Sequence, residues 1–204
     1  MKKLLTVLLI SIFVLGISSK SFSQNMEHRS TVSANVGVSL IGTILEAAIA
    51  SDDSGVSREG VTHIPAVQVN YDFAVLKFLT VGGGVSYESI SLTGTGTDDN
   101  GVTYTANVSA SVMNFAARAL FHYANSGRLD LYSGVRMGYE LAGFNANITD
   151  GVENAYTPPA NYGFVAPQLV LFGFRGYFTD NFGASAELAI GWPHFLTVGL
   201  NYRF

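Results

Sequence analysis

Residues 195–204, at the end of the sequence, read FLTVGLNYRF, and this stretch decides the fold. One alternating set is apolar or aromatic and consists of Leu196, Val198, Leu200, Tyr202 and Phe204. The other set consists of Thr197, Gly199, Asn201 and Arg203. A period of two puts alternate side chains on opposite faces of a β-strand. The stretch therefore predicts a strand with apolar surroundings on one side and polar groups on the other.

The beginning of the sequence predicts export. Lys2 and Lys3 precede a mostly apolar run over residues 4–17, and several serines follow it. This order is typical of a signal peptide, and the run is shorter than the ~20 apolar residues that a spanning helix needs. We expect a signal peptide over 1–23, cut after Ser23, and one barrel domain over 24–204. The sequence has no Cys, so neither a lipid-bearing cysteine nor a disulfide is expected.

Composition points to a membrane protein that spans with strands. Hydrophobic residues make up 48% of the chain and charged residues 13%, yet no helix-length stretch after Ile17 is free of polar interruption. In lipid every backbone N–H and C=O must be paired within the protein, so non-helical spanning chains close into barrels. Acidic residues number 15 against 11 basic ones. This balance argues against nucleic acid as a partner.

The period-two pattern recurs and predicts seven further strands. They cover residues 31–41, 66–73, 79–88, 112–123, 129–141, 163–178 and 182–191. Short connections at 74–77, 124–128 and 179–181 alternate with long ones at 42–63, 92–108 and 142–162, and a short corner at 192–194 is the exception. Transmembrane barrels have short periplasmic turns and longer outer loops. We therefore predict an all-β, single antiparallel eight-stranded up-and-down transmembrane β-barrel with both ends of the chain in the periplasm.

Two places depart from strict alternation. Residues 108–112 have the opposite phase to the strand that follows them, and residues 169–172 are all apolar, close to Pro167. One extra residue in a strand re-aims every later side chain, and proline removes a donor from the ladder. A β-bulge is therefore predicted at each of the two places.

Three features resemble the small outer-membrane β-barrel family, of the OmpA/OmpX-like, porin-like type. They are the predicted signal peptide, the turn at 177–181 running into Ala186-Glu187-Leu188, and the terminal pattern. The resemblance covers essentially the whole chain after residue 23, and nothing in it resembles the peptidoglycan-binding domain of longer relatives. It implies a monomer in the Gram-negative outer membrane, in contact with lipid and lipopolysaccharide. In this family the last strand carries an assembly signature for the barrel-assembly machinery, which here corresponds to Val198, Leu200, Tyr202 and Phe204.

Charged residues on the inward phase predict a polar lumen. They are Glu88, Arg118, Arg136, Glu140, Arg175, Glu187 and Arg203. Arg118 and Arg136 lie on neighbouring predicted strands, and Glu187 is the expected anion between them, in a lumen charge cluster that also includes Glu88 and Glu140. Such a cluster can serve as a gate or ion pathway or simply fill the lumen. An eight-stranded barrel is only just wide enough for its own side chains, which favours filling.

The sequence favours a non-enzymatic barrel with a structural, envelope or surface-interaction role. The alternative is a narrow porin or a small-molecule conduit. A rim hydrolase would need a positioned base beside a hydroxyl, and only His63 and His194 could reach the outer rim. A soluble lipocalin-like barrel would place its apolar residues inside. We predict no catalytic residue, cofactor or metal site: the segments 52–55 and 98–101 offer carboxylates for divalent cations, but their Asp, Asn and Gly residues are also typical of solvated turns.

Overall fold

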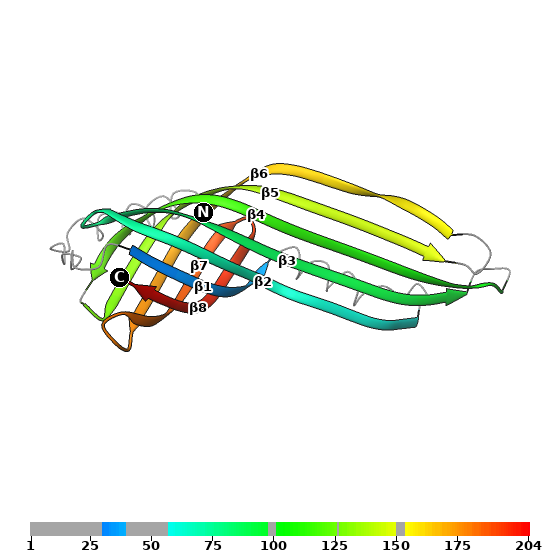
Figure 1. Cartoon of the computed structure of the whole chain (residues 1–204), viewed down its shortest axis with the longest axis horizontal. Helices are drawn as coiled ribbons and strands as arrows, with labels where there is room; N and C mark the ends of the chain where they lie inside the picture. The colour runs from blue at the N-terminus through cyan, green and yellow to red at the C-terminus, as the bar shows by residue number, and fades with distance from the viewer. Residues whose placement is uncertain (1–29, 40–56, 98–100, 126, 150–153) are drawn as a thin grey trace, which may run out of the picture.

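The computed structural model describes residues 30–39, 57–97, 101–125, 127–149 and 154–204, so the predicted signal peptide lies outside the described residues. The strands are β1 (Ser30–Ser39), β2 (Ser57–Leu76), β3 (Leu79–Thr97), β4 (Thr103–Asn125), β5 (Leu129–Thr149), β6 (Asn154–Tyr177), β7 (Phe182–Gly191) and β8 (His194–Arg203). They form one closed barrel in chain order, with each neighbouring pair antiparallel (Figure 1). The predicted fold class is confirmed. No helix in the described ranges is long and apolar enough to cross a membrane.

The seam between β1 and β8 closes the barrel. Val32 lies opposite Tyr202, and the pairing runs along both strands to Val38 and Leu196. Where β1 begins and β8 ends, Ser30 N donates to Phe204 O at 3.1 Å and Phe204 N donates to Ser30 O at 2.9 Å. The terminal residues therefore belong to the barrel wall.

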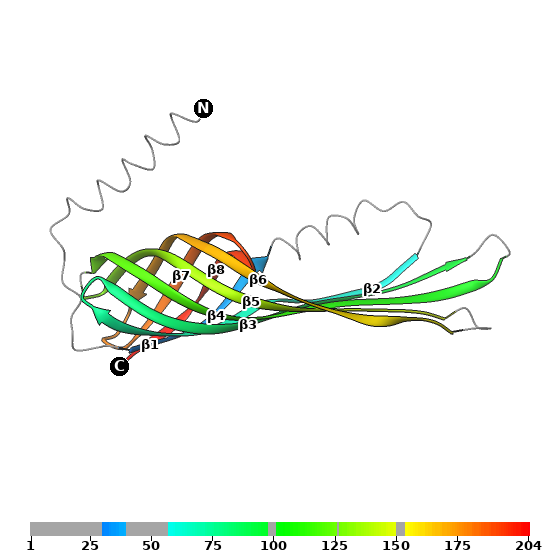
Figure 2. The same ribbon diagram turned by 90° about the horizontal axis from the view of Figure 1, so that it is seen from above.

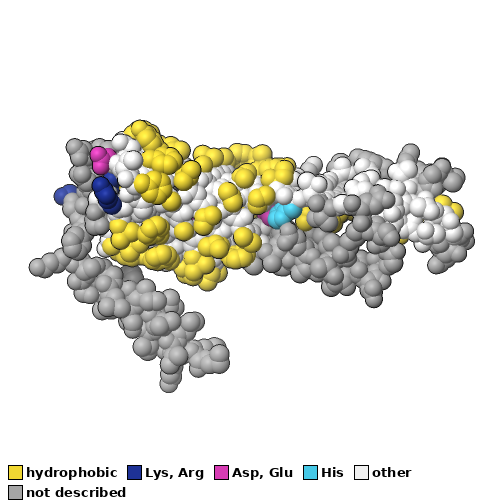
Figure 3. Space-filling view, turned by 90° about the horizontal axis from the view of Figure 1, so that it is seen from below, with side chains coloured by type: hydrophobic (Ala, Val, Ile, Leu, Met, Phe, Trp, Pro, Cys, Tyr) yellow, Lys and Arg dark blue, Asp and Glu magenta, His cyan; other side chains and the backbone are white. Residues whose placement is uncertain are grey.

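Side chains alternate between an apolar outside and a polar inside. Large outward side chains form an apolar belt, and Figure 3 shows one face of it. The exposed apolar residues of the belt include Val36, Val69, Tyr71, Val85, Phe115, Val135, Met137, Tyr139, Leu169, Ile190, Val198, Leu200, Tyr202 and Phe204. Buried polar residues such as Asn70, Asn114 and Asn201 alternate with them and face the lumen. Alternation of this kind buries polar groups where they can pair and leaves apolar groups for lipid.

Five strands continue past the barrel at one end. Pairing between β1 and β2 stops at Gly37 opposite Ala66, and pairing between β6 and β7 stops at Gln168 opposite Gly191. Beyond these points β2 to β6 run on as a single twisted sheet, which we call the extension (Figures 1 and 2). We call the opposite end of the barrel, where the connections are short, the turn end.

The extension corrects the predicted outer loops. β3 and β4 pair as far as Thr97 opposite Thr103, and β5 and β6 pair as far as Thr149 opposite Asn154. Most of the predicted loops at 92–108 and 142–162 is therefore strand, as are residues 57–63. The rest of the first predicted loop, residues 42–56, lies outside the described residues.

The bulge predicted near Val112 is wrong. The register between β3 and β4 is continuous over their whole length, and β4 and β5 pair without a shift from Thr105 to His122. The two faces exchange polarity instead: on β4, Val112 and Ala110 follow Asn114 on the inner face, while Ser111 follows Met113 on the outer face. Beyond the apolar belt the outer face meets water, so polar residues can occupy it.

The bulge predicted in strand six is confirmed. Leu171 and Phe172 together oppose Ser133 of β5, and both are exposed on the outside. Pro167 lies where the pairing with β7 ends, and its carbonyl accepts a hydrogen bond from Trp192 N at 3.3 Å. Proline is tolerated there because β6 has no β7 partner beyond this point, so that side of the strand is an edge.

Candidate functional site: the barrel lumen

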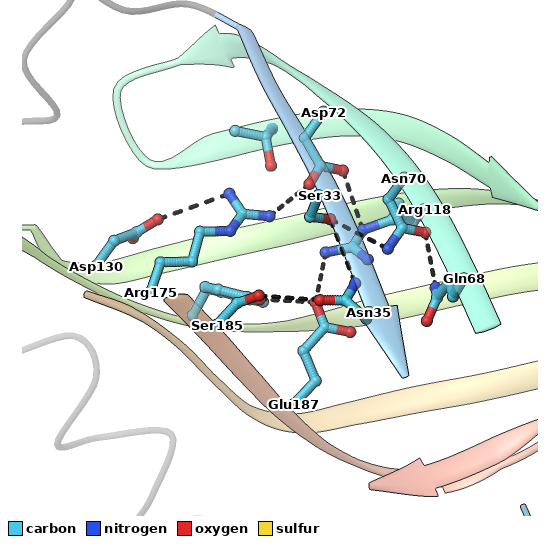
Figure 4. Close-up of polar contacts among 12 residues, drawn as sticks. Ser33, Asn35, Gln68, Asn70, Asp72, Arg118, Asp130, Arg175, Ser185 and Glu187 are labelled. Carbon is cyan, nitrogen blue, oxygen red and sulfur yellow. Dashed lines mark hydrogen bonds and ion pairs between the residues drawn. The ribbon is translucent and has the colours of Figure 1, made fainter. Parts of the chain in front are cut away.

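Five acidic and basic side chains contact one another across the lumen toward the turn end (Figure 4). Arg118 Nη2 lies 2.7 Å from Glu187 Oε1, and Arg118 Nε lies 3.0 Å from Asp72 Oδ1. The second contact is ionic, because its angles do not meet hydrogen-bond geometry. Arg175 Nη2 reaches the other oxygen of Asp72 at 2.5 Å, and Arg175 Nη1 lies 3.8 Å from Asp130. We call these five residues the lumen ion network.

Neutral and aromatic groups tie the lumen ion network to further strands. Tyr132 of β5 donates its hydroxyl to Glu187 Oε1 at 2.7 Å, and the Arg175 guanidinium lies 4.6 Å from the centre of the Tyr132 ring. His122 Nδ1 lies 2.6 Å from Asp130 Oδ1. The connected side chains come from β2, β4, β5, β6 and β7, so the contacts span most of the barrel's circumference. Charge-assisted hydrogen bonds of this kind are stronger than neutral ones.

Glycines on facing strands make room for the large inward side chains. A Cβ on Gly173 of β6 would run into the Tyr132 ring, and a Cβ on Gly82 of β3 would meet Asp72. A narrow barrel can hold Tyr132 and Arg175 in its lumen only if neighbouring inward positions are small. The inward glycines therefore help to place the lumen ion network.

The predicted charge cluster divides into three parts. Arg118 and Glu187 belong to the lumen ion network. Arg136, which lies directly opposite Arg118, donates to Asn114 Oδ1 at 2.5 Å. Asn114 Nδ2 in turn donates to Glu140 Oε1 at 2.7 Å.

Glu88, the fifth predicted residue, lies near the end of the barrel from which the extension continues. Its carboxylate accepts a hydrogen bond from Ser39 Oγ at 2.6 Å and lies 3.3 Å from His63 Nε2. Glu187 therefore contacts one of the two arginines between which it was predicted to lie, while Asn114 holds the other. Glu88 and Glu140 contact separate sets of polar side chains.

Sequence reasoning did not include three members of this lumen arrangement. Asp72 lies in the inward phase of its strand, so the alternation of residues 66–73 could have revealed it. Asp130 and Tyr132 share the inward phase of β5, but Asp130 follows a turn, where aspartate is common. Tyr132 is aromatic, and aromatics are expected outside in such a barrel. Only the completed barrel places these residues beside Arg175.

One triad of side chains has the elements of a hydrolytic site. Thr80 Oγ1 lies 3.0 Å from His122 Nε2, and the other ring nitrogen contacts Asp130. A hydroxyl, an imidazole and a carboxylate in this order can activate a nucleophile. Here Thr80, His122 and Asp130 are only 4%, 8% and 3% exposed. Because they are buried, these three side chains contact other side chains of the lumen and not solvent. We interpret the triad as a set of hydrogen bonds that joins β3, β4 and β5.

The remaining candidates from the sequence are placed as follows. His63 lies beside Glu88, and His194 is buried at the start of β8, where its carbonyl accepts a hydrogen bond from Gln168. In the described part of the chain, no group of three or more His, Asp or Glu side chains could hold a metal ion. Residues 52–55 and 98–100, considered for divalent cations, lie outside the described residues.

Comparison with known proteins finds similar solved structures only. No family model and no curated protein matches the chain. Ail, the attachment invasion locus protein of Yersinia pestis, solved in complex with the heparin analogue sucrose octasulfate, is 13% identical over 88% of this chain and 100% of its own, with a TM-score of 0.49. The N-terminal β-barrel domain of Pseudomonas aeruginosa OprF is 14% identical over 87% of this chain and 100% of its own, with a TM-score of 0.38.

The translocator domain of the autotransporter NalP from Neisseria meningitidis is 10% identical, with a TM-score of 0.42, and the match covers 98% of this chain and 95% of that one. At these scores the fold assignment rests on the chain itself. Its strand order, closure and register are complete around the ring. Most large apolar side chains of the wall face outward, while the buried charged side chains face the lumen. By these features the chain is a closed, eight-stranded antiparallel β-barrel of the transmembrane type.

Proposed function

We propose that the chain is a non-enzymatic, integral outer-membrane barrel whose lumen is filled by its own side chains, with a structural or surface-interaction role. The apolar belt supports the membrane placement, because large side chains such as Val135 and Met137 are more than half exposed on the outside. A transmembrane barrel presents such a belt to lipid, whereas exposing the same apolar surface to water would be unfavourable. The turn end then faces the periplasm and the extension faces outward.

The lumen ion network carries the proposal that the barrel is closed. Arg118 and Arg175 are each in contact with two carboxylates, and both arginine side chains are at most 2% exposed. A solute passing through the barrel would have to break these contacts. Separating these groups would leave buried charges without partners, which is costly, so the lumen ion network supports a closed barrel.

The extension supports the surface-interaction role. In the described residues, β2 and β6 border it and have no strand on their far sides beyond the rim. An unpaired strand edge can accept an extended segment of another chain through backbone hydrogen bonds. Lipid and lipopolysaccharide remain the proposed neighbours of the belt, and the barrel-assembly machinery remains the proposed partner of Val198, Leu200, Tyr202 and Phe204.

A narrow porin is the second candidate, and buried polar atoms in the half of the lumen nearer the extension favour it. In the described part of the chain, Arg136 Nε, Glu140 Oε2 and both ring nitrogens of His194 are buried without a hydrogen-bond partner. Buried polar groups without protein partners usually bind water. A porin would require a continuous column of water that also passes the lumen ion network.

Planar-bilayer conductance of the refolded protein tests the choice. We expect no steady current from the parent and a measurable current from a variant carrying Arg118→Ala and Arg175→Ala, because both bridging cations are then missing. The control is Arg128→Ala, an exposed arginine in the turn before β5, which should stay silent. Steady current from the parent would establish the porin instead.

A further inference from the structure

The lipid-facing wall has a hollow in the middle of the apolar belt. It has a volume of about 570 Å³ and spans β1 to β4. Its outer lining is apolar and includes Val32, Val69, Tyr71, Val85 and Phe115 around Gly83. Each of these five side chains is 37–50% exposed, so they form the walls of the hollow without covering it.

Gly83 is what leaves this space open. Its two neighbours, Gly82 and Gly84, face inward, and a Cβ on either would collide with Asp72 or Asn70. A Cβ on Gly83 would point outward, and within 4 Å, among the described residues, it would meet only the Ala116 carbonyl oxygen, at 3.2 Å. Packing against the lumen therefore requires two of the three glycines, while the third creates an opening in a belt of large side chains.

Tyr71 is held beside the opening. It lies directly opposite Gly83 on the neighbouring strand, where an aromatic ring often covers a glycine. Its hydroxyl forms a hydrogen bond with Ser30 Oγ at 2.9 Å. This bond restrains the ring at the edge of the hollow, so the protein does not fill the space with its own side chain.

We propose that the hollow at Gly83 is a binding site for one acyl chain of a membrane phospholipid. This inference rests on the proposed membrane placement, since the hollow is continuous with the belt that lipid covers. The outer lining has no charged group, and its polar hydroxyl is already engaged by Ser30. An acyl chain matches such a surface in polarity, and its gain on binding scales with the apolar area that it covers.

Native mass spectrometry of the whole chain in detergent, titrated with palmitoyl-oleoyl-phosphatidylethanolamine, tests this site. The parent should retain one lipid per chain. Gly83→Leu fills the hollow and should weaken retention about tenfold, the factor expected when roughly two methylene groups lose their contact. The matched control is Ala186→Leu, at an outward position on β7 away from the hollow, and it should retain lipid like the parent.

A second variant keeps the test decisive if Gly83→Leu does not fold. Phe115→Ala removes a wall of the hollow without adding a Cβ near Ala116, and it should also weaken retention. Equal retention by the parent and the folded variants would overturn the proposal. So would a dimer that Gly83→Leu dissociates, because a second copy would then occupy the hollow. Release of the parent into buffer without detergent would instead refute the membrane placement itself.

Discussion

Replacing Arg118 by methionine should destabilise the barrel more than replacing Glu187 by methionine. Both side chains lie in the lumen ion network and are joined at 2.7 Å. Methionine is unbranched and apolar, so each change removes the charge and keeps much of the volume. The contact that joins the two residues is lost in both variants, and what differs is the set of charges left behind.

The magnitudes follow from the remaining partners. Without Arg118, Glu187 has no arginine in contact, and Asp72 and Asp130 are left with Arg175 alone. Breaking a buried pair by removing one partner costs about 3–5 kcal/mol. Because Arg118 contacts two carboxylates, we expect the cost of Arg118→Met to lie near the upper end of this range. Without Glu187, two arginines still face two aspartates, and the main further loss is the acceptor of the Tyr132 hydroxyl. An unsatisfied buried donor costs about 1–3 kcal/mol, so we expect about 2–3 kcal/mol.

Urea titration in detergent micelles measures the difference. The single tryptophan, Trp192, reports unfolding by fluorescence, and heat-modifiable migration reports the folded barrel independently. Linear extrapolation gives the free energy of unfolding for each variant. The exposed Arg128→Met serves as the control for loss of an arginine. The double variant should cost less than the sum of the two single variants, because neither charge is left without the other. A Glu187→Met variant as unstable as Arg118→Met, or strict additivity, would refute this account of the network.

Three further predictions concern the wall and its closure. Val135→Lys, in the middle of the apolar belt, should destabilise the barrel by about 2–4 kcal/mol in lipid vesicles, whereas Ser91→Lys, on the outer face of the extension, should change the free energy of unfolding by less than about 0.5 kcal/mol. Gly173→Ala should cost about 1–3 kcal/mol in urea titration, because its methyl group overpacks the lumen against Tyr132. Phe204→Ala should lower the fraction of heat-modifiable barrel recovered from membranes in cells, since it removes the last residue of the proposed assembly signature.

Two matched variants control the last two predictions. Gly60→Ala places a methyl group where no atom lies within 4 Å, so a large cost there would show that loss of glycine, and not overpacking, is responsible. Phe178→Ala removes an aromatic residue that is 59% exposed near the turn end but outside the last strand. Equal loss of assembled protein from Phe178→Ala and Phe204→Ala would contradict a specific role for the terminal pattern.

Strand alternation predicts the barrel because lipid and lumen impose opposite polarity on the two faces. The ends of β7 and β8 agree with the predicted strands within one residue. The run at Leu171 and Phe172 correctly indicates a bulge, since two adjacent apolar residues in a spanning strand both need lipid. The short connections between β4 and β5 and between β6 and β7 also fall where Gly127, Asp180 and Asn181 break the pattern.

The lumen contacts are less predictable, because phase gives the direction of a side chain but not its partner across the barrel. Arg136 and Glu187 share the inward phase, but they do not contact each other. Arg136 donates a hydrogen bond to Asn114, while Glu187 contacts Arg118 and Tyr132. Which residues meet depends on strand tilt, because contacts across the lumen join residues far apart in the register. Alternation alone carries no information on that tilt.

A reversal of phase has two physical causes, and neighbouring strands distinguish them. A bulge shifts the side chains of one strand, whereas the end of the lipid layer changes what every strand prefers to show on its outer face. In this barrel Tyr87, Met113 and Leu141 are the last large apolar residues on the outer faces of β3, β4 and β5, and they pair with one another in the register. Beyond them the outer faces of the three strands carry only serine, threonine, asparagine and glycine, while Ile90, Val112 and Phe144 occupy the inner one. Reversal at paired positions therefore marks the boundary of the membrane, and on β4 the outward apolar run from Met113 to Phe121 covers roughly nine residues, as a spanning strand of ~9–11 residues requires.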